Sequence, residues 1–328
     1  MSNRLDVVAI GNAIVDVLAQ VEDEFLSTNG VEKGIMTLID QDRAQALYGA
    51  MPAATEISGG SAANTAAAAA AIGAKTGFLG KVRDDQLGQI FAHDIRALGV
   101  EYAGPITPEA SDAETSRCLV MVSEDGERSM NTFLGASVGL IADDIDTDLM
   151  GRADWLYLEG YLFDTPEAKA AYARAIWATK KGGGKTSITL SDPFCVDRHR
   201  GDFRNLIRSE MDLVFANKAE IKSLYQTDDL DEALDAVAHD VEIAAITLSE
   251  EGAVVVRGNE RTKVSARPTT IVDTTGAGDL FAAGFLAGLA QGASDDRAAS
   301  MGCAAAAEII SHLGARPEAD LKALMASL

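Results

Sequence analysis

Short apolar runs typical of β-strands alternate along this chain with longer segments that have helical spacing. The strand-like runs are DVVAIGN, TGFLGKV, WLYLEG, TSITLSD, LVFAN and AAITLSEEGAVVV. Residues 213–216 and 244–248 are apolar runs of the kind found in central strands, which are buried on both faces. Strands that alternate with helices predict an α/β fold, in which helices cover both faces of a mostly parallel sheet.

Two segments, residues 13–45 and 100–134, depart from this alternation and resemble series of short strands. The second contains RCLVMV and RSMNTF on either side of Asp125 and Gly126, which is typical of a β-hairpin. These segments are expected either to pair as a small β lid beside the main sheet or to form its edge strands. We predict a single α/β domain over residues 1–328, with a lid formed by segments near 13–45 and 100–134.

The strongest chemical signal is the sequence VDTTGAGDLFAAGFLAGLAQG, residues 272–292. Phe281, Phe285 and Leu289 recur every four residues, which predicts a helix with a buried apolar stripe. Small residues fill much of the rest of this segment and permit close packing against a neighbouring element. The segment is therefore expected to be a buried helix.

This helix should begin at Gly276, Ala277 and Gly278, whose free N–H groups can bind phosphate oxygens at the positive end of the helix dipole. Asp279 follows in the first turn. A carboxylate beside such an anion hole can accept a proton from an attacking hydroxyl group. The alternative is that Asp279 only complements the helix dipole.

Composition narrows the classes of partner. The chain has 328 residues, with 28 basic and 50 acidic residues and a formal net charge of −22, which disfavours nucleic acid and anionic membranes as partners. The three cysteines, Cys118, Cys195 and Cys303, are widely spaced. This spacing fits neither a zinc site nor a disulfide framework. Together with an N-terminus that lacks a signal-peptide pattern, this spacing predicts a cytoplasmic protein.

The sequence DTTGAGDLFAAGF resembles the C-terminal signature of the ribokinase, or PfkB, family of carbohydrate and nucleoside kinases. A second family pattern is SGGSAANTAAAAAAIGAKTGFLGKVRDDQLG, residues 58–88, and GNAIVD, NKAE and TLSEEG match as well. The resemblance implies a doubly wound α/β domain with a β lid. It also implies transfer of the γ-phosphoryl group of ATP to a substrate hydroxyl, with Asp279 as general base.

The resemblance assigns the substrate hydroxyl groups to Asn12, Asp16, Gly60 and Asn64. The chemistry is consistent, because aspartate accepts from two hydroxyls, asparagine both donates and accepts, and glycine lets the backbone approach a sugar ring. Without the family, Asn12 and Asp16 would be interpreted as a turn after a strand. Asn64 would equally suit the N-cap of the alanine-rich helix.

The same resemblance places ATP and its cations on later segments. Asn217 and Glu220 in NKAE match a family pair that handles phosphate and Mg²⁺ through water, and a hydrated Mg²⁺ needs few carboxylates. Asp273 matches a family position that helps to bind K⁺. A further set matches the nucleotide-contacting loop, although the family often has glycine at the second of its positions: Thr247, Ser249 and Gly252.

Within the family, the motifs that most resemble those of adenosine kinases are GNAIVD, SGGSAAN, GERSMN and EGYLFD. Adenosine kinases phosphorylate the 5′-hydroxyl of adenosine and thereby form AMP in purine salvage. By this resemblance Arg128 meets phosphate and Met130 lines the base pocket. Leu162 stands where a second aromatic residue is expected. The alternatives are a kinase for ribose, fructose or 2-keto-3-deoxygluconate, a non-catalytic ligand-binding protein on the same fold, and ADP as donor. A monomer or a homodimer is expected.

Overall fold

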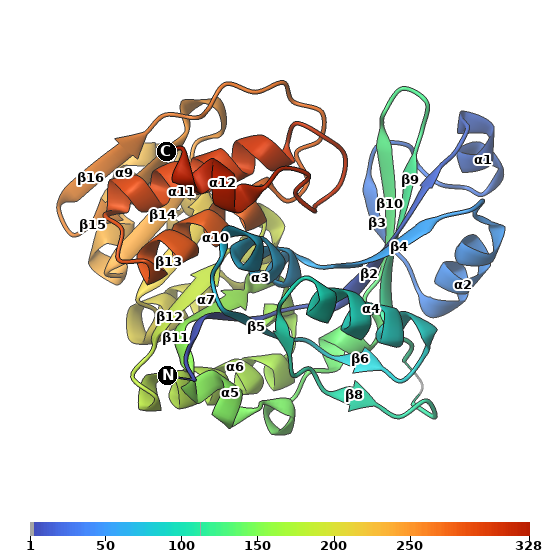
Figure 1. Ribbon diagram of the computed structural model, residues 1–328, viewed down its shortest axis with the longest axis horizontal. Helices are drawn as coiled ribbons and strands as arrows, with labels where there is room; N and C mark the ends of the chain where they lie inside the picture. Colours follow the sequence, from blue (N-terminus) through green and yellow to red (C-terminus); the bar gives the residue numbers. More distant parts are fainter. Residues whose placement is uncertain (1–2, 112) are drawn as a thin grey trace.

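The computed structural model describes residues 3–111 and 113–328, and in this part of the chain nine strands form one large sheet (Figure 1). Their spatial order is β16 (Glu260–Val264), β15 (Ala253–Arg257), β14 (Ile243–Thr247), β13 (Leu213–Asn217), β12 (Lys185–Thr189), β11 (Ala153–Glu159), β1 (Leu5–Ile10), β5 (Thr76–Leu79) and β7 (Glu101–Tyr102). Neighbours from β14 to β7 are parallel, and β15 and β16 add an antiparallel edge. The predicted fold class is confirmed, and each strand-like run of the sequence contributes to this sheet.

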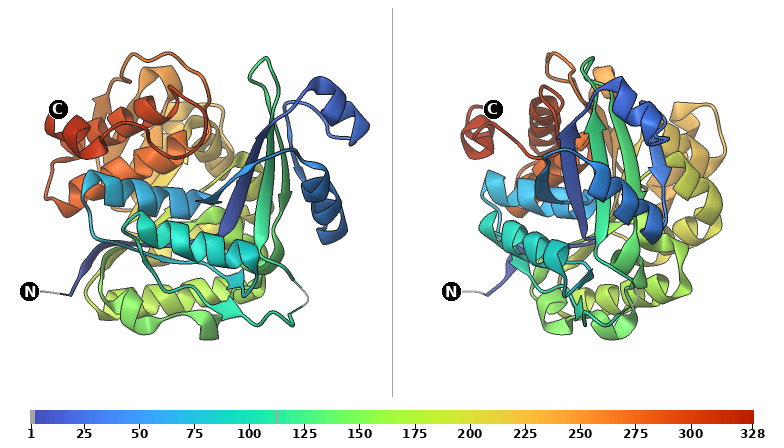
Figure 2. Two further views of the ribbon diagram at one scale, coloured as in Figure 1. Left: turned by 45° about the vertical axis from the view of Figure 1, so that its right-hand side comes forward. Right: turned by 90° about the vertical axis from the view of Figure 1, so that its right-hand side faces the viewer.

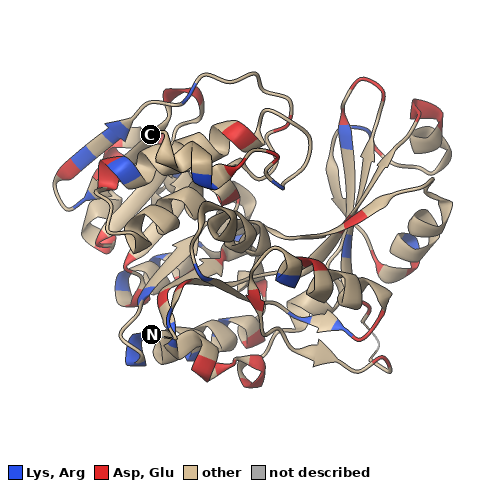
Figure 3. Cartoon of the chain, in the orientation of Figure 1, with Lys and Arg blue, Asp and Glu red and all other residues tan. Residues whose placement is uncertain are grey.

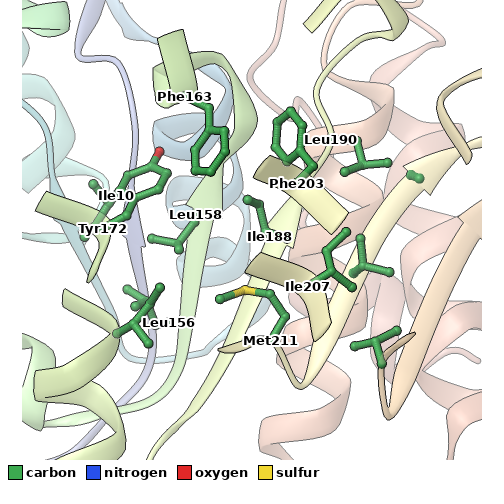
Figure 4. Close-up of a cluster of buried hydrophobic side chains, with 14 of the residues drawn as sticks. Ile10, Leu156, Leu158, Phe163, Tyr172, Ile188, Leu190, Phe203, Ile207 and Met211 are labelled. Carbon is green, nitrogen blue, oxygen red and sulfur yellow. The ribbon is translucent and has the colours of Figure 1, made fainter. Parts of the chain in front are cut away.

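The two faces of the sheet are buried in different apolar clusters because alternate residues of each strand point to opposite sides. In β1, Val8 and Ile10 belong to one cluster, whereas Val7 and Ala9 belong to the other. Figure 4 shows part of the first cluster, in which strand residues such as Leu158 face aromatic side chains. The helices on that face are α5 (Thr147–Gly151), α6 (Pro166–Lys181), α7 (Pro193–Glu210), α8 (Lys218–Tyr225) and α9 (Leu230–Asp240).

The opposite face carries the helices that build the site. They are α3 (Ser61–Ile72), α4 (Gln86–Ala97), α10 (Ala277–Ala290), α11 (Asp295–Ile309) and α12 (Leu321–Ala326). Helix α10 packs closely on α11, because a Cβ atom at Gly284 would lie only 2.6 Å from the carbonyl oxygen of Met301. The small residues of α10 are therefore required by helix packing, and the predicted buried helix is confirmed.

A second sheet of five strands stands beside the main one and forms the lid (Figure 2). Its order is β3 (Met36–Leu38), β10 (Arg128–Phe133), β9 (Ser116–Val122), β2 (Ile14–Gln20) and β4 (Thr55–Gly59). The hairpin expected around Asp125 and Gly126 is present as β9 and β10. One face of the lid sheet packs on its own helices, α1 (Asp23–Thr28) and α2 (Gln41–Ala50), and the other faces the main sheet.

The lid segments predicted from the sequence need three corrections. Residues 13–45 are not all strand, because they include α1 and the start of α2. The edge strand β4 lies outside both predicted segments. Within residues 100–134, Glu101–Tyr102 joins the main sheet, while β8 (Ile106–Thr107) pairs with β6 (Val82–Arg83). These elements are short, so their periodicity is too weak to assign them to one sheet or the other.

Four short 3₁₀ helices complete the described part of the chain: η1 (Gly135–Gly139), η2 (Ala142–Asp144), η3 (Gly160–Asp164) and η4 (Ser249–Glu251). Acidic and basic side chains are interspersed over both the α/β layer and the lid (Figure 3). Among the helices that the structure describes, none is both long and apolar enough to cross a membrane.

Candidate active site

The strand order places a ligand site at the carboxyl ends of β1 and β11. The chain leaves β1 toward β5 on one side and returns to β11 on the other, and doubly wound sheets bind ligands at such a switch point. Glu159, the last residue of β11, accepts hydrogen bonds from the backbone N–H of Asn12 at 3.2 Å and from its side-chain amide at 2.7 Å. It also accepts from the N–H of Ala62 at 2.9 Å, so one carboxylate joins β1, β11 and the start of α3.

Asp279 lies where the N-termini of α10 and α3 meet. Its Oδ1 atom accepts from the hydroxyl of Ser61 at 2.6 Å, and its Oδ2 atom accepts from the side-chain amide of Asn64 at 3.0 Å. Burial raises the pKa of Asp279, and the two hydrogen bonds and the charge of Arg316 oppose that rise. A half-buried carboxylate held by donors is suited to accept a proton.

The turn before α10 has the geometry expected of an anion hole. Gly276 is the N-cap and has a φ of +79°, a left-handed conformation that favours glycine. Gly278 is exposed, and a Cβ atom built there would meet no protein atom within 4 Å. The N–H of Ala277 donates to the carbonyl oxygen of Thr274 at 3.3 Å, so the open space beside Asp279 lies at Gly278.

The glycine pair before α3 permits close packing of the predicted substrate residues. A Cβ atom at Gly59 would lie 2.3 Å from Oδ2 of Asp16, and one at Gly60 would lie 2.1 Å from the carbonyl oxygen of Asn12. Gly60 is the N-cap of α3 and has a φ of +98°. The alternative interpretation of Asn64 as the N-cap is therefore wrong, since Asn64 lies inside the helix.

Asp16 lies on the lid face that looks toward Asp279. Register pairing across the lid aligns Leu38, Thr132, Cys118 and Asp16 in one row, so these side chains share a face of the sheet. Burial raises the pKa of Asp16 to about 6. The charges of Arg316 and Arg128 oppose this rise, and Asp279 adds to it.

A cavity of about 430 Å³ opens at the other end of that row. Leu38, Phe133 and Val138 contribute apolar side chains to its wall, and Gln41 and Thr132 contribute polar groups. Thr132 is two strands from Asp16, which corresponds to about 10 Å at the usual spacing of roughly 4.8 Å between strands. Leu38 and Thr132 of its wall therefore stand in the same row as Asp16.

Arg128 joins the lid to the α/β layer. Its Nη1 atom donates to Oδ2 of Asp273, in an ion pair whose side chains are only 11% and 6% exposed. Asp273 also accepts from the backbone N–H groups of Thr275 and Gly314, both at 3.0 Å. Met130 lies two residues further along the same lid strand and packs on its small apolar cluster.

The nucleotide residues expected from the sequence gather at the carboxyl ends of β13 and β14. Asn217 and Thr247 are register partners. Ser249 and Gly252 form the turn into β15 with φ values of +54° and +98°, and a Cβ atom at Gly252 would lie 2.0 Å from the carbonyl oxygen of Val264. Gly252 is thus required by packing, whatever it binds.

A family model for "pfkB family carbohydrate kinase" matches residues 34–321. The chain belongs to the PfkB family. It resembles the structure of a probable sugar kinase from Rhizobium etli, with 49% identity, a TM-score of 0.89, and 100% of this chain and 99% of that chain covered. The structure of adenosine kinase from Sinorhizobium meliloti is 48% identical, with a TM-score of 0.89 and 99% of each chain covered.

Adenosine kinase from Saccharomyces cerevisiae is 27% identical over 331 residues, which cover 94% of this chain and 95% of that protein. As a PfkB kinase, the protein is a phosphotransferase with an alcohol group as acceptor, from a family that uses ATP. The predicted family and enzyme class are confirmed. The predicted site residues remain predictions, although the structure brings Asp16, Asn64 and Asp279 together.

Some PfkB site residues predicted here also have structural roles. Asn12 is buried, and both ends of its side-chain amide have protein partners: Nδ2 donates to Glu159, and Oδ1 accepts from Ser137 at 2.8 Å. The amide therefore holds neighbouring elements of the site together. Asn217 and Glu220 form a capping box at the start of α8. Asp273 is already neutralised by Arg128, an arrangement that does not favour K⁺ there, and potassium dependence stays a prediction.

Two residues at the site were not found from the sequence. Arg316 donates through Nη1 to Oδ1 of Asn64 and through Nη2 to the carbonyl oxygen and, at 3.0 Å, the hydroxyl of Ser58. It lies in a loop without periodicity, where nothing distinguishes it from a surface arginine. Glu159 had a usable signal, because an acidic residue that ends a run as apolar as WLYLE must be buried or paired.

Proposed function

We propose that this PfkB kinase transfers the γ-phosphoryl group of ATP to the 5′-hydroxyl of adenosine and forms AMP. The observation that carries the proposal is the cavity at the β3 edge of the lid, whose wall includes Leu38 and Thr132 from the row that contains Asp16. A nucleoside has a polyol at one end and a flat, largely apolar base at the other. A free sugar has no group that would fill this cavity. The similarity to the Sinorhizobium meliloti adenosine kinase supports the same choice.

On the acceptor side, Asp16 accepts from the 2′ and 3′ hydroxyls of the ribose, and Asn64 orients the sugar at the start of α3. Asp279 takes the proton of the 5′-hydroxyl while the 5′-oxygen forms a bond to the γ-phosphorus. At the same time, the bond between the γ-phosphorus and the oxygen that bridges it to the β-phosphate breaks. The turn of Gly276, Ala277 and Gly278 stabilises the charge on the transferring group, mainly through the N–H of Gly278, because the N–H of Ala277 already donates to Thr274. ADP leaves, and the proton stays on Asp279.

On the donor side, Asn217, Thr247 and Ser249 border the nucleotide. Glu220 and Asn217 fit Mg²⁺ held through water, because their side chains place a carboxylate and an amide oxygen together at the start of α8 and oxygen atoms are the ligands that Mg²⁺ prefers. Bound Mg²⁺ supplies neutralisation of phosphate charge. The protein's own contribution is to hold these oxygen ligands at the carboxyl end of β13.

The charges at the site favour a neutral acceptor over a sugar acid. Arg128 already pairs with Asp273, and Arg316 already donates to Asn64 and Ser58. An acidic substrate would have to displace one of these partners and would also face the carboxylates of Asp16 and Asp279. A non-catalytic binding role is disfavoured, since a binding protein has no use for a half-buried base beside an anion hole.

The test is a phosphoryl-transfer screen with ATP over adenosine, other nucleosides, ribose, fructose and 2-keto-3-deoxygluconate, followed by 2′-deoxyadenosine. Loss of one hydroxyl leaves an oxygen of Asp16 unpaired and costs about 1–3 kcal/mol, so adenosine should exceed 2′-deoxyadenosine by roughly tenfold or more in kcat/KM. Asp16→Ala should remove most of that difference. Faster turnover of a sugar or sugar acid than of adenosine would overturn the nucleoside assignment and leave the kinase class intact.

A further inference from the structure

Arg316 reaches the site from the loop between α11 and α12. Its guanidinium group connects this loop to two other elements. It donates to Asn64 on α3 and to Ser58 on the lid strand β4. Ser58 is itself fixed by Asp94 of α4, which accepts from its N–H at 2.8 Å and from its hydroxyl at 2.6 Å. The arginine is thus anchored on the lid side and directed at Asn64.

This contact determines which end of the Asn64 amide faces Asp279. A carboxamide has a donor end and an acceptor end of nearly the same shape. Arg316 has only donors, so it selects the Oδ1 end of Asn64. The amide N–H₂ is then turned toward Oδ2 of Asp279, to which it donates at 3.0 Å. In the opposite orientation, an amide oxygen would face the carboxylate and disfavour its ionised form.

We propose that Arg316 is a positioning residue that fixes the orientation of Asn64 and thereby keeps Asp279 ionised as the general base. This inference rests on the proposed role of Asp279. Arg316 itself contacts neither the proton nor the phosphoryl group that is transferred.

The charges around Asp279 show why such a device is needed. Asp16 faces it from the lid and Glu159 from the end of β11. The phenol groups of Tyr157 on β11 and Tyr161 on η3 also lie close enough to interact with its charge. Two of these neighbours are acids, and burial also raises the pKa of Asp279. Arg316 is a cation that faces both Asp16 and Asp279 and opposes that rise in each.

The decisive measurement is the pH dependence of kcat/KM for Arg316→Gln, with ATP and the acceptor that the screen finds to be fastest. Loss of the cation should move the acid limb upward by about one pH unit, the lower end of the effect of an opposite charge nearby. Turnover at neutral pH should fall roughly 10- to 100-fold. Arg316→Lys keeps the charge but cannot bridge two partners with one planar group, so its acid limb should stay in place while kcat falls.

A double-mutant cycle separates positioning from a structural role. If Arg316 acts through Asn64, its substitution should have little further effect once Asn64 is alanine. In the Asn64→Ala background, Arg316→Gln should therefore lower kcat by less than about threefold. Arg297→Gln is the matched control, because Arg297 donates to the carbonyl oxygen of Met325 at 2.8 Å and joins α11 to α12 away from the site. Its acid limb and turnover should equal those of the unmodified protein.

An unshifted acid limb in Arg316→Gln, or fully multiplicative effects with Asn64→Ala, would overturn the proposal. If Arg316→Gln does not fold in thermal unfolding, Arg316→Lys decides alone, and wild-type kcat in that variant would overturn it. Asp279→Asn is measured alongside. If Asp279→Asn is fully active, both the proposed base and this inference are wrong. If Asp279→Asn is inactive but Arg316→Gln behaves like the unmodified protein, only this inference is wrong.

Discussion

Opposing influences act on the Asp279 carboxylate. Burial disfavours its charge, while Ser61, Asn64 and Arg316 favour it. Asp279→Asn keeps the shape and removes the basicity, so turnover should fall by roughly two to four powers of ten with folding and ATP binding nearly unchanged. Single-turnover kinetics and calorimetric titration of ATP provide the two measurements. A variant that keeps most of its turnover would remove Asp279 from the mechanism.

Asp16, which is proposed to bind the ribose hydroxyls, is expected to lower the stability of the fold. Its pKa is about 6 in the folded protein and 3.8 as its ordinary value, so the folded state binds its proton more tightly than the unfolded state does. Stability therefore falls as pH rises from about 4 to 6, and the full cost is present above pH 6. At neutral pH this cost amounts to about 1–3 kcal/mol.

Asp16→Asn should accordingly raise the free energy of unfolding by about 1–3 kcal/mol at pH 8, and the gain should shrink below pH 6. Urea unfolding of both proteins at pH 8, 6 and 5 measures this difference. The same substitution should impair turnover, because the amide cannot accept from two hydroxyls. A gain that is independent of pH would show that the Asp16 carboxylate is not the source of the cost.

At the scale of single elements, α10 combines a tightly packed body with an open first turn. Gly278→Ala places a methyl group where no protein atom lies within 4 Å and should stabilise the helix by about 0.5–1 kcal/mol. The same methyl group intrudes on the space in which the phosphoryl group is proposed to lie, so turnover should fall at least roughly tenfold. The combination of higher Tm and lower kcat is the expected signature.

Gly201→Ala is the matched control for this prediction. Gly201 lies within α7, and a Cβ atom there also meets no protein atom within 4 Å. It should raise Tm in the same way without changing kcat. Unchanged kinetics for Gly278→Ala would contradict an anion hole at the start of α10.

How far the sequence predicted each element depends on how local its cause is. The start of α10 was predictable, because the glycines of the predicted anion hole and an acid in the first turn stand next to one another in the chain. The strands of the main sheet were predictable, because a continuous apolar run is stable only where both faces of the strand are buried. Strand β4 was not, since TEISG has no apolar alternation and joins the lid only through pairing with β2.

Contacts between distant residues explain the rest of what was missed. Arg316 acts on Asn64 across 252 positions of sequence, and Glu159 on Asn12 across 147. Neither side chain belongs to a local motif that indicates its partner. The apolar cavity likewise requires Leu38, Phe133 and Val138 to meet, and only the folded lid brings them together.

At the scale of the whole molecule, the lid and the α/β layer are joined near the site by the Arg128–Asp273 ion pair. Both side chains are almost fully buried. A charge that loses its buried partner is costly, and the lid can relieve that cost by opening to water. Asp273→Asn removes the buried charge that pairs with Arg128. Arg128→Met, in contrast, leaves Asp273 with the N–H groups of Thr275 and Gly314.

Asp273→Asn should therefore open the lid more than Arg128→Met does, and the double variant should open it less than Asp273→Asn alone. Amide hydrogen exchange of peptides from residues 116–133 measures this opening, with peptides from β12 and β13 as internal reference. The coupling between the two substitutions should be about 1–3 kcal/mol, a factor of roughly 5 to 150 in the opening equilibrium. Additive effects would show that the pair does not hold the lid. Because the acceptor is proposed to lie between Asp16 on the lid and Asp279 on α10, the variants should rank in the same order by KM for the acceptor.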